Sequence, residues 1–430
     1  SATPQMMEQG TKEKALKVTN VERILVDIPF GPVAERNMNR ELVGWHISEV
    51  CRVTTDAGIV GYGETLPNYT WGLVSQEGID RVMRRSPFEV MWDDSLGCGL
   101  QMALFDAAGK AAGVPCYRLM GHQVREWCPI SWWSIDMPAE DFVAEARQAV
   151  ELGYVSYKQK ARPWFDIHRQ VAETAKVIPD YFKLDLDFNG QLVNAGNAVT
   201  ILKDLDTFPN VAIYESPIPQ GDVDGNKKIR AQVRCPIAMH YGSPPIMTAL
   251  REEVCDGFVI GGGATGVLRQ AQVAQEANKP FWLQLVGTGI TTAFALHLGA
   301  VCTHAQWPAV TCLNLYQHQL LAEPIVVQGG YAHVPEAPGL GIVVPEDVLQ
   351  RFRTDSSIRQ RTRAMYVVVR PNGERTYYAS ETQYWDDFLG GNQIGFEPSI
   401  TLQASPDDGS EDWKKLEAKV RKGPVRSRGG

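Results

Sequence analysis

The sequence predicts an α/β protein in which a TIM-type (β/α) barrel follows an N-terminal α+β capping domain. Two observations predict the barrel. Four apolar strands end in charged or polar side chains and follow one another by roughly 25 to 28 residues, the length of one strand, one helix and two short loops. The alternation can be followed to about eight strands, the number in such a barrel. The cap is predicted because roughly the first 125 residues show strand patterns and then helical patterns, before the repeat begins.

Length and composition bound the number of domains and exclude some partners. At 430 residues the chain is longer than one hydrophobic core supports, so a barrel of about 250 residues with a further unit is expected. The net charge of -8 argues against a nucleic-acid surface. No apolar run approaches the ~20 residues that cross a membrane. The eight cysteines have no C-x-x-C spacing, which favours buried thiols in a reducing compartment, and a cytoplasmic location is expected.

The region before the barrel is expected to form a lead-in and the cap. The lead-in is polar and contains no apolar signal segment. Val18 to Pro29 and Trp45 to Gly63 alternate apolar and polar residues, and Asp56-Ala57-Gly58 divides the second run, which predicts an antiparallel meander. From Val74 to Met120 the pattern becomes helical, most clearly in Gly99 to Ala112.

Two polar loops of the cap are candidates for substrate contacts. The first, Gly31 to Glu41, contains Arg36, Asn37 and Asn39, and the second, Glu64 to Gly72, contains Tyr69 and Trp71. Loops with polar and aromatic side chains on a small domain suit contacts to a substrate, although about half of such loops are only solvated.

The barrel elements and the C-terminal tail follow from the same patterns. Besides the four strand ends described below, strands are predicted at Cys128 to Trp133, Asp256 to Ile260, Pro280 to Val286 and Ala309 to Leu315, with helices at Ala139 to Leu152, Val199 to Leu205, Pro245 to Glu252 and Gly287 to Cys302. In the tail, Met365 to Ala379 is predicted to be a hairpin with its turn at Asn372-Gly373, Ser410 to Lys422 to be helical, and Val425 to Gly430 to be disordered. The expected boundaries are 1–17 for a flexible lead-in, 18–125 for the cap, 126–328 for the barrel, 329–360 for a return segment toward the cap and 361–430 for a C-terminal extension.

The four strand ends predict the functional site. They are Tyr157-Lys158-Gln159-Lys160, Leu184 to Asn189, Ile213 to Pro217 and Pro236 to His240. Because strand side chains alternate between faces, Lys158 and Lys160 should share a face, as should Asp185 and Asp187. Barrel active sites lie where the carboxyl ends of the strands meet. Carboxylates beside ammonium groups are what a hard divalent cation and a proton abstraction both require.

With these residues in place, the chain resembles the enolase superfamily, in particular the branch of mandelate racemase and muconate lactonizing enzyme. The likeness rests on several motifs that occur in the family's order over roughly residues 18 to 350. They are Gly61-Tyr62-Gly63-Glu64-Thr65, Ala103-Leu104-Phe105-Asp106, Gly113-Val114-Pro115, Lys158-Gln159-Lys160, Leu186-Asp187-Phe188-Asn189, Tyr214-Glu215-Ser216-Pro217, Gly262-Gly263 and Pro338-Gly339-Leu340-Gly341.

The resemblance implies a Mg²⁺ ion held by carboxylates at three consecutive strand ends, and a lysine that removes the proton α to a substrate carboxylate. Asp187 and Glu215 match the first two metal ligands, and Lys160 matches the base, with Lys158 beside it. Where the family has an acid as third ligand, this chain has His240, so another divalent cation is also considered, because imidazole suits softer ions than Mg²⁺.

Two further departures favour chemistry from one side of the substrate. Where the racemase branch places a histidine on the seventh strand this chain has Gln284, and where the lactonizing branch places a lysine on the sixth it has Ile260-Gly261. We therefore expect Lys160 to abstract the proton, and the same lysine, His240 or Tyr241 to protonate a leaving group. This favours a metal-dependent lyase that dehydrates an acid sugar, because β-elimination needs one base only.

Two alternatives remain open: a barrel that has lost the reaction and serves as a binding protein, and an isomerase or racemase of the same family. The expected partner is a small carboxylate, and a homo-oligomer is expected. Besides the cap residues, the candidates for binding the substrate are Arg162, Asn189, Gln284 and Asn314.

Some motifs are better explained structurally. His297 lies in an apolar helical pattern and is expected to be a core histidine. Gly261, Gly263 and Gly266 satisfy the dinucleotide pattern G-x-G-x-x-G, but no acidic residue follows about 20 positions on, so a tight strand-to-helix turn is the better interpretation. Asp185 either pairs with a lysine or is buried and neutral.

Overall fold

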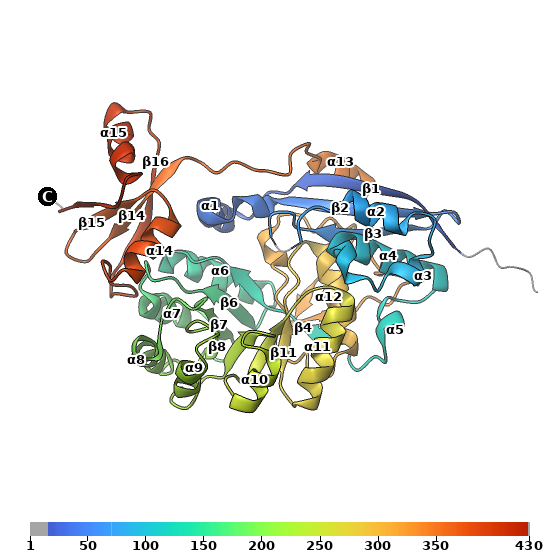
Figure 1. Cartoon of the computed structure of the whole chain (residues 1–430), viewed down its shortest axis with the longest axis horizontal. Helices are drawn as coiled ribbons and strands as arrows, with labels where there is room; N and C mark the ends of the chain where they lie inside the picture. Colours follow the sequence, from blue (N-terminus) through green and yellow to red (C-terminus); the bar gives the residue numbers. More distant parts are fainter. Residues whose placement is uncertain (1–15, 70, 429–430) are drawn as a thin grey trace, which may run out of the picture.

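The computed structural model describes residues 16–69 and 71–428, so the predicted lead-in lies outside the described residues except for its last two. Figure 1 shows three parts: a capping domain, a domain built on a parallel sheet, and a C-terminal module at one end of the molecule. Within the described residues no helix is both long and apolar enough to cross a membrane.

The cap is the predicted antiparallel meander with helices packed on it. Its strands β1 (Val18–Asp27), β2 (Ile47–Thr55) and β3 (Val60–Thr65) pair in that order. The helix α4 (Cys98–Ala112) lies so close to β3 that a Cβ atom at Gly63 would stand 1.9 Å from the Gly99 carbonyl oxygen. The remaining cap elements are α2 (Gln76–Val82), α3 (Pro87–Val90), α5 (Tyr117–Met120) and the 3-10 helices η1 (Val43–His46) and η2 (Asp94–Leu96).

The first polar segment of the cap is a helix, not the predicted loop. This helix, α1 (Pro32–Glu41), begins with Pro32, whose fixed φ and missing N–H suit the first turn. Its buried residues Ala34, Asn37 and Met38 follow helical spacing, a signal hidden by the polar residues between them.

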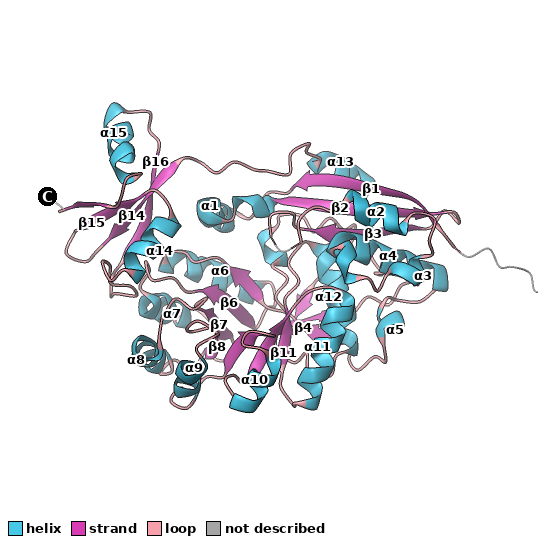
Figure 2. Cartoon of the chain, in the orientation of Figure 1, coloured by secondary structure: helices cyan, strands magenta, loops and turns pink. Residues whose placement is uncertain are grey.

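The central domain is a sheet of seven parallel strands with helices around it, which Figure 2 shows in magenta and cyan. Its strands, in spatial order, are β5 (Trp132–Ser134), β6 (Ser156–Lys160), β7 (Lys183–Asp187), β8 (Val211–Glu215), β9 (Ile237–His240), β10 (Gly257–Ile260) and β11 (Phe281–Leu283). The helices are α6 (Ala139–Glu151), α7 (Ile167–Ala175), α8 (Ala195–Leu205), α9 (Val223–Arg230), α10 (Ile246–Glu252), α11 (Ala264–Glu276) and α12 (Gly289–Val301). In register, Lys160 pairs with Asp187, and Asp187 with Glu215.

The predicted eighth strand, Ala309 to Leu315, is not formed as a regular strand. Ala309 makes an isolated parallel bridge to Ile130, and Val310 makes one to Gln284. The 3-10 helix η3 (Leu313–Leu315) follows directly, because Cys312 has φ +58° and leaves the extended conformation. The predicted first strand is also divided: β4 (Trp127–Pro129) pairs antiparallel with β13 (Tyr331–His333), which in turn pairs with β12 (Val327–Gln328), and only β5 joins the parallel sheet.

The C-terminal module, residues 364–427, is a four-stranded antiparallel sheet with two helices. Its elements are β14 (Ala364–Val369), β15 (Arg375–Tyr378), α14 (Glu381–Leu389), β16 (Thr401–Pro406), α15 (Glu411–Val420) and β17 (Val425–Ser427), and α13 (Glu346–Phe352) lies in the segment that precedes it. The hairpin predicted around Asn372-Gly373 and the helix after Ser410 are confirmed. The prediction of disorder from Val425 is wrong for Val425–Ser427, which pair with β15; residues 429–430 lie outside the described residues.

Candidate active site

The four predicted strand ends meet at one edge of the parallel sheet. Lys160 Nζ lies 2.5 Å from Asp187 Oδ2, and Lys158 Nζ lies 3.5 Å from the same oxygen. Lys158 also makes a close ion pair with Glu215, and His240 Nε2 lies 3.1 Å from Glu215 Oε1. Two ammonium groups, two carboxylates and an imidazole therefore form one cluster across β6 to β9.

Lys158, Asp187 and Glu215 are buried, and neighbouring charges shift the pKa of Lys158 and of Asp187. Burial alone would lower the pKa of Lys158, but the carboxylates of Glu215 and Asp187 outweigh it and raise the pKa. Burial alone would raise the pKa of Asp187, and the Lys160 and Lys158 ammonium groups instead lower it. Asp185, below them on β7, differs: burial raises its pKa to about 7, because Lys158 offsets the loss of water only in part.

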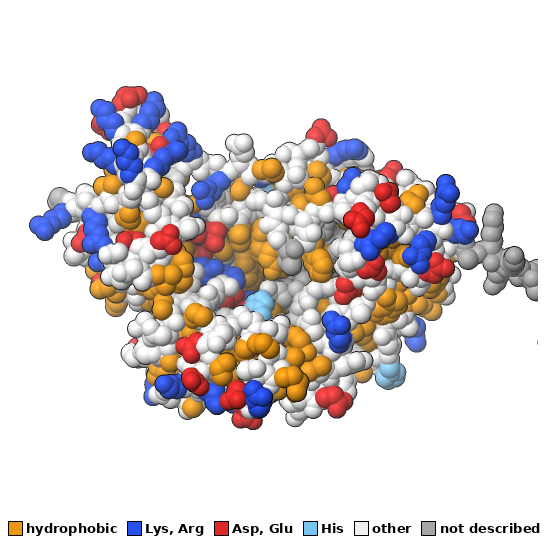
Figure 3. Space-filling view, in the orientation of Figure 1, with side chains coloured by type: hydrophobic (Ala, Val, Ile, Leu, Met, Phe, Trp, Pro, Cys, Tyr) orange, Lys and Arg blue, Asp and Glu red, His pale blue; other side chains and the backbone are white. Residues whose placement is uncertain are grey.

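A cavity of about 250 Å³ opens beside the two lysines. Its size suits a small ligand, since pockets for drug-sized ligands start at about 300 Å³. Figure 3 shows charged side chains of both signs gathered in a hollow on this face of the molecule. The lining includes seven of the residues predicted from the sequence: Tyr69, Lys158, Lys160, Arg162, Asn189, His240 and Gln284.

Other lining residues were not predicted from the sequence. Glu41, Leu42 and Trp45 come from the cap, and Trp133 and Ile135 come from β5 and the residues after it. Trp45 and Trp133 stack with ring centroids 5.4 Å apart. Their indole rings form an apolar wall of the cavity. Local sequence patterns do not predict this wall, because it forms through a tertiary contact.

The polar residues of α1 lie elsewhere. Arg36 Nη2 lies 2.5 Å from Asp141 Oδ1 of α6, and Asn37 Nδ2 donates to Asp141 Oδ2 at 2.8 Å. Asn39 Nδ2 donates to Glu35 Oε1, at 3.0 Å. These three residues are absent from the lining of the cavity, and their described contacts join α1 to α6 and to the preceding turn of α1 itself.

Trp71 and Tyr241 line a second cavity of about 340 Å³, which shares Tyr69, His240 and Gln284 with the first. Asn314 contacts the backbone of β5: its Oδ1 accepts from the Trp133 N–H at 3.0 Å, and its Nδ2 donates to the Trp133 carbonyl at 2.8 Å.

The carboxylates of the cluster provide the kind of oxygen donor that a divalent cation prefers. Both oxygens of Glu215 are buried: Oε2 makes the close ion pair with Lys158, and Oε1 lies 3.1 Å from His240 Nε2. Oxygen donors from adjacent strands are what Mg²⁺ binds. As they stand, no three His, Cys, Asp or Glu side chains of the described residues are grouped to hold a metal. The Lys158 ammonium group, which pairs with both Asp187 and Glu215, provides the positive charge there.

Two motifs set aside from the sequence have structural partners. His297 is buried, its Nδ1 accepts from the Tyr117 N–H, its Nε2 faces the Leu340 carbonyl, and burial lowers its pKa to about 4. The N–H groups of Thr265 and Gly266, at the start of α11, donate to the Asp94 carboxylate at 3.0 and 2.7 Å. A carboxylate of the protein thus occupies the position that a dinucleotide phosphate would need.

The chain is similar to several known enzymes. Residues 141–348 match the family described as enolase C-terminal domain-like. D-gluconate dehydratase of Thermoproteus tenax is 23% identical over 362 residues, covering 72% of this chain and 70% of the relative. Chloromuconate cycloisomerase of Cupriavidus pinatubonensis is 25% identical over 373 residues, covering 78% of this chain and 98% of the relative. The structure of 2-chloromuconate cycloisomerase from Rhodococcus opacus 1CP aligns with a TM-score of 0.66 at 20% identity, over 79% of this chain and 99% of that one.

Proposed function

The chain belongs to the enolase superfamily, in the branch of mandelate racemase and muconate lactonizing enzyme, and from this membership we propose that it is an acid-sugar dehydratase. Its relatives are enzymes: cycloisomerases, a racemase, and dehydratases of D-gluconate, arabinonate, D-galactonate and D-xylonate. Among these reactions, the dehydration of an acid sugar fits a site with one base.

The one-sided distribution of charge is the observation that supports this choice. Both lysines, both carboxylates and His240 belong to β6 to β9. From Ala277 to Ala322 the sequence contains no Asp, Glu or Arg and only one lysine, Lys279, and the side chain facing the cavity from after β11 is the neutral Gln284. A racemase needs an acid or base on each face of the substrate carbon, whereas an elimination does not.

In the proposed reaction Lys160, in its neutral amine form, accepts the proton α to the substrate carboxylate. Asp187 and Asn189 hold its Nζ at 2.5 and 2.9 Å, and the same nitrogen borders the cavity. The electron pair of the broken C–H bond forms the Cα–Cβ double bond, and the C–O bond at Cβ breaks. Lys160, now protonated and on the same cavity, donates this proton to the departing hydroxyl, which leaves as water. The resulting enol becomes a 2-keto-3-deoxy acid.

Asp187 and Glu215, with His240 as third donor, are the residues that would hold a divalent cation, Mg²⁺ in the first place. Such a cation supplies positive charge to the carboxylate oxygens, where the negative charge of the enediolate develops. Lys158, already paired with both carboxylates, and Arg162 are placed to bind the substrate carboxylate from the protein's own side. The homo-oligomer and the cytoplasmic location stay predictions.

A screen of acid sugars in deuterated water tests the proposal. A substrate is expected to lose water and give the keto acid, observed by proton NMR. Lys160→Ala should abolish both the elimination and any exchange of the α-proton. Lys183→Ala is the matched control, because Lys183 is exposed at the opposite end of β7. Exchange that persists in Lys160→Ala at the wild-type rate would show that another group is the base.

A further inference from the structure

The C-terminal module packs directly on the loop that follows the catalytic lysine candidate. Trp164 and Phe165, in the loop between β6 and α7, share a buried core with Tyr366, Val368, Tyr378, Tyr384, Ile400 and Leu402 of the module. The rings of Trp164 and Tyr384 meet edge to face at 5.1 Å. The N–H of Phe396 donates to the Pro163 carbonyl at 2.7 Å. The module is therefore joined to a segment that begins one residue after Lys160.

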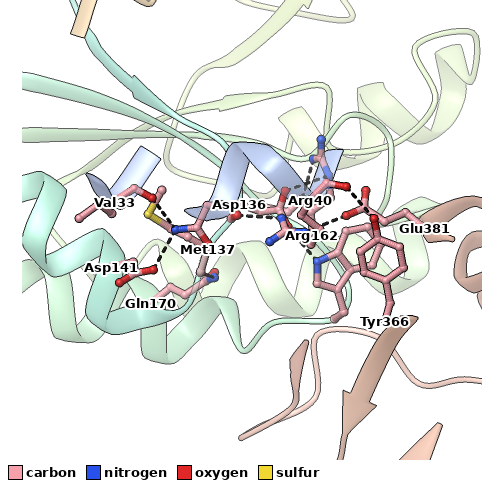
Figure 4. A network of polar contacts seen from close by, with 12 residues as sticks. Val33, Arg40, Asp136, Met137, Asp141, Arg162, Gln170, Tyr366 and Glu381 are labelled. Atoms are coloured by element: carbon pink, nitrogen blue, oxygen red, sulfur yellow. Dashed lines mark hydrogen bonds and ion pairs between the residues drawn. The ribbon is translucent and has the colours of Figure 1, made fainter. Parts of the chain in front are cut away.

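A second junction ties the module to the cap through Arg40, and Figure 4 shows Arg40 between Asp136 and Glu381. Its Nε donates to Glu381 Oε1 of α14 at 2.8 Å, and its Nη2 donates to Asp136 Oδ2 at 2.5 Å. The Tyr366 hydroxyl donates to the Arg40 carbonyl at 2.6 Å. We name Arg40, Asp136 and Glu381 the clasp; their side chains are 10%, 0% and 15% exposed. Hydrogen bonds from a buried charged group such as the Arg40 guanidinium contribute more than exposed surface pairs do.

The clasp lies next to residues that line the active-site cavity. Arg40 is followed by Glu41 and Leu42, and Trp45 comes one turn later; all three border the cavity. On the other side, Asp136 Oδ1 lies 3.9 Å from Arg162 Nε, and Arg162 also borders the cavity. The clasp thus connects the module to the cap segment on one side and to Arg162 on the other.

We propose that the C-terminal module is a positioning element of the active site: Glu381 and Tyr366 hold Arg40, and so fix the cap segment 40–45 and Arg162 against the two lysines. The term active site rests on the proposed function, but the mechanical coupling does not. The aligned cycloisomerase structure spans 99% of its own length and 79% of this chain, so about a fifth of this chain has no counterpart there. Since the family match ends at residue 348, the module lies outside it. This chain thus fixes the cap by contacts from beyond the matched family domain.

Hydrogen exchange of the full-length protein, measured by mass spectrometry without any substrate, tests the coupling. In Glu381→Ala the amides of residues 32–46 should exchange roughly tenfold faster than in the wild type, because one buried charged bond to Arg40 is lost. Tyr366→Phe, which removes only the hydroxyl that donates to Arg40, should accelerate the same peptides to a smaller extent. Asp386→Ala, on an exposed position of the same helix, is the control and should change nothing there.

A conservative variant separates positioning from general loosening. Burial, with the carboxylates of Glu41 and Asp136 nearby, raises the pKa of Glu381 to about 9, so a neutral side chain of the same shape suits the position. Glu381→Gln retains an oxygen that accepts from Arg40, and should restore wild-type protection of residues 32–46. Unchanged exchange of those residues in both Glu381→Ala and Tyr366→Phe would overturn the proposal, as would faster exchange confined to residues 364–427. Neither result depends on the identity of the reaction, so failure of the dehydratase assay leaves this test intact.

Discussion

Replacing Lys158 by methionine tests whether the buried carboxylates form a cation site. The substitution keeps an unbranched apolar stem and removes the ammonium group that pairs with both Asp187 and Glu215. The side chains of these three residues are only 1 to 2% exposed. Removing one partner of a buried ion pair costs about 3–5 kcal/mol, and we expect the lower end, because Lys160 and His240 still accompany the two carboxylates.

The response to a divalent cation makes the test specific. An ammonium group and a divalent cation compete for the same two carboxylates, so the Lys158→Met variant should be stabilised by MgCl₂ more than the wild type is. At a concentration about 100 times Kd, binding contributes about 2.7 kcal/mol, enough to offset most of the loss.

Thermal unfolding with increasing MgCl₂, at an ionic strength matched with NaCl, measures both effects. Lys183→Met, at the exposed end of β7, controls for the loss of a lysine and should respond as the wild type does. If Lys158→Met gains no more stability from MgCl₂ than Lys183→Met, the carboxylates are not the cation site and the reasoning fails.

Three further predictions follow from other parts of the fold. Burial raises the pKa of Glu145 to about 7 from an ordinary value near 4.5, so the folded state keeps this proton to a higher pH than the unfolded state does. The free energy of unfolding therefore falls by about 3 kcal/mol as the pH rises between these two values. Glu145→Gln should remove this loss, and its melting temperature relative to the wild type should rise from about pH 5 to about pH 8. Gly63→Ala should destabilise the fold by about 1–3 kcal/mol or more, and so lower the melting temperature, because its Cβ would stand 1.9 Å from the Gly99 carbonyl oxygen. Gly221→Ala meets nothing within 4 Å and should be tolerated. His240→Asp should bind Mg²⁺ about tenfold more tightly in a calorimetric titration, because it replaces a nitrogen ligand by a carboxylate; equal affinity would exclude His240 as a ligand.

The strand ends could be predicted from the sequence because parallel strands impose a simple rule. Once each strand is located, its period of two decides which side chains share a face, and the β/α spacing places Lys160, Asp187 and Glu215 in neighbouring registers. The cap meander was predictable for the same reason, since Asp56-Ala57-Gly58 marks its turn. These features depend on local patterns only.

The remaining features depend on contacts that local patterns do not contain. The helix α1 was missed because its buried residues include Asn37, a polar side chain that is buried only where Asp141 receives it. The same tertiary pairing accounts for the absence of Arg36 from the cavity. The prediction of a regular eighth strand was wrong, because an apolar run gives no indication of the positive φ of Cys312. The stacked Trp45 and Trp133, from two domains, become a wall only when cap and sheet meet.

The balance of charge in the cluster explains why a histidine at the third position is compatible with the proposed chemistry. Relative to an acid there, His240 makes the site more positive by one unit, which weakens cation binding but favours the extra negative charge of an enediolate. Lys158 acts in the same direction, because its ammonium group remains paired with both carboxylates at the bottom of the site. Part of the positive charge that a metal would supply is thus built into the side chains of this protein, and its need for a tightly bound cation should be correspondingly smaller.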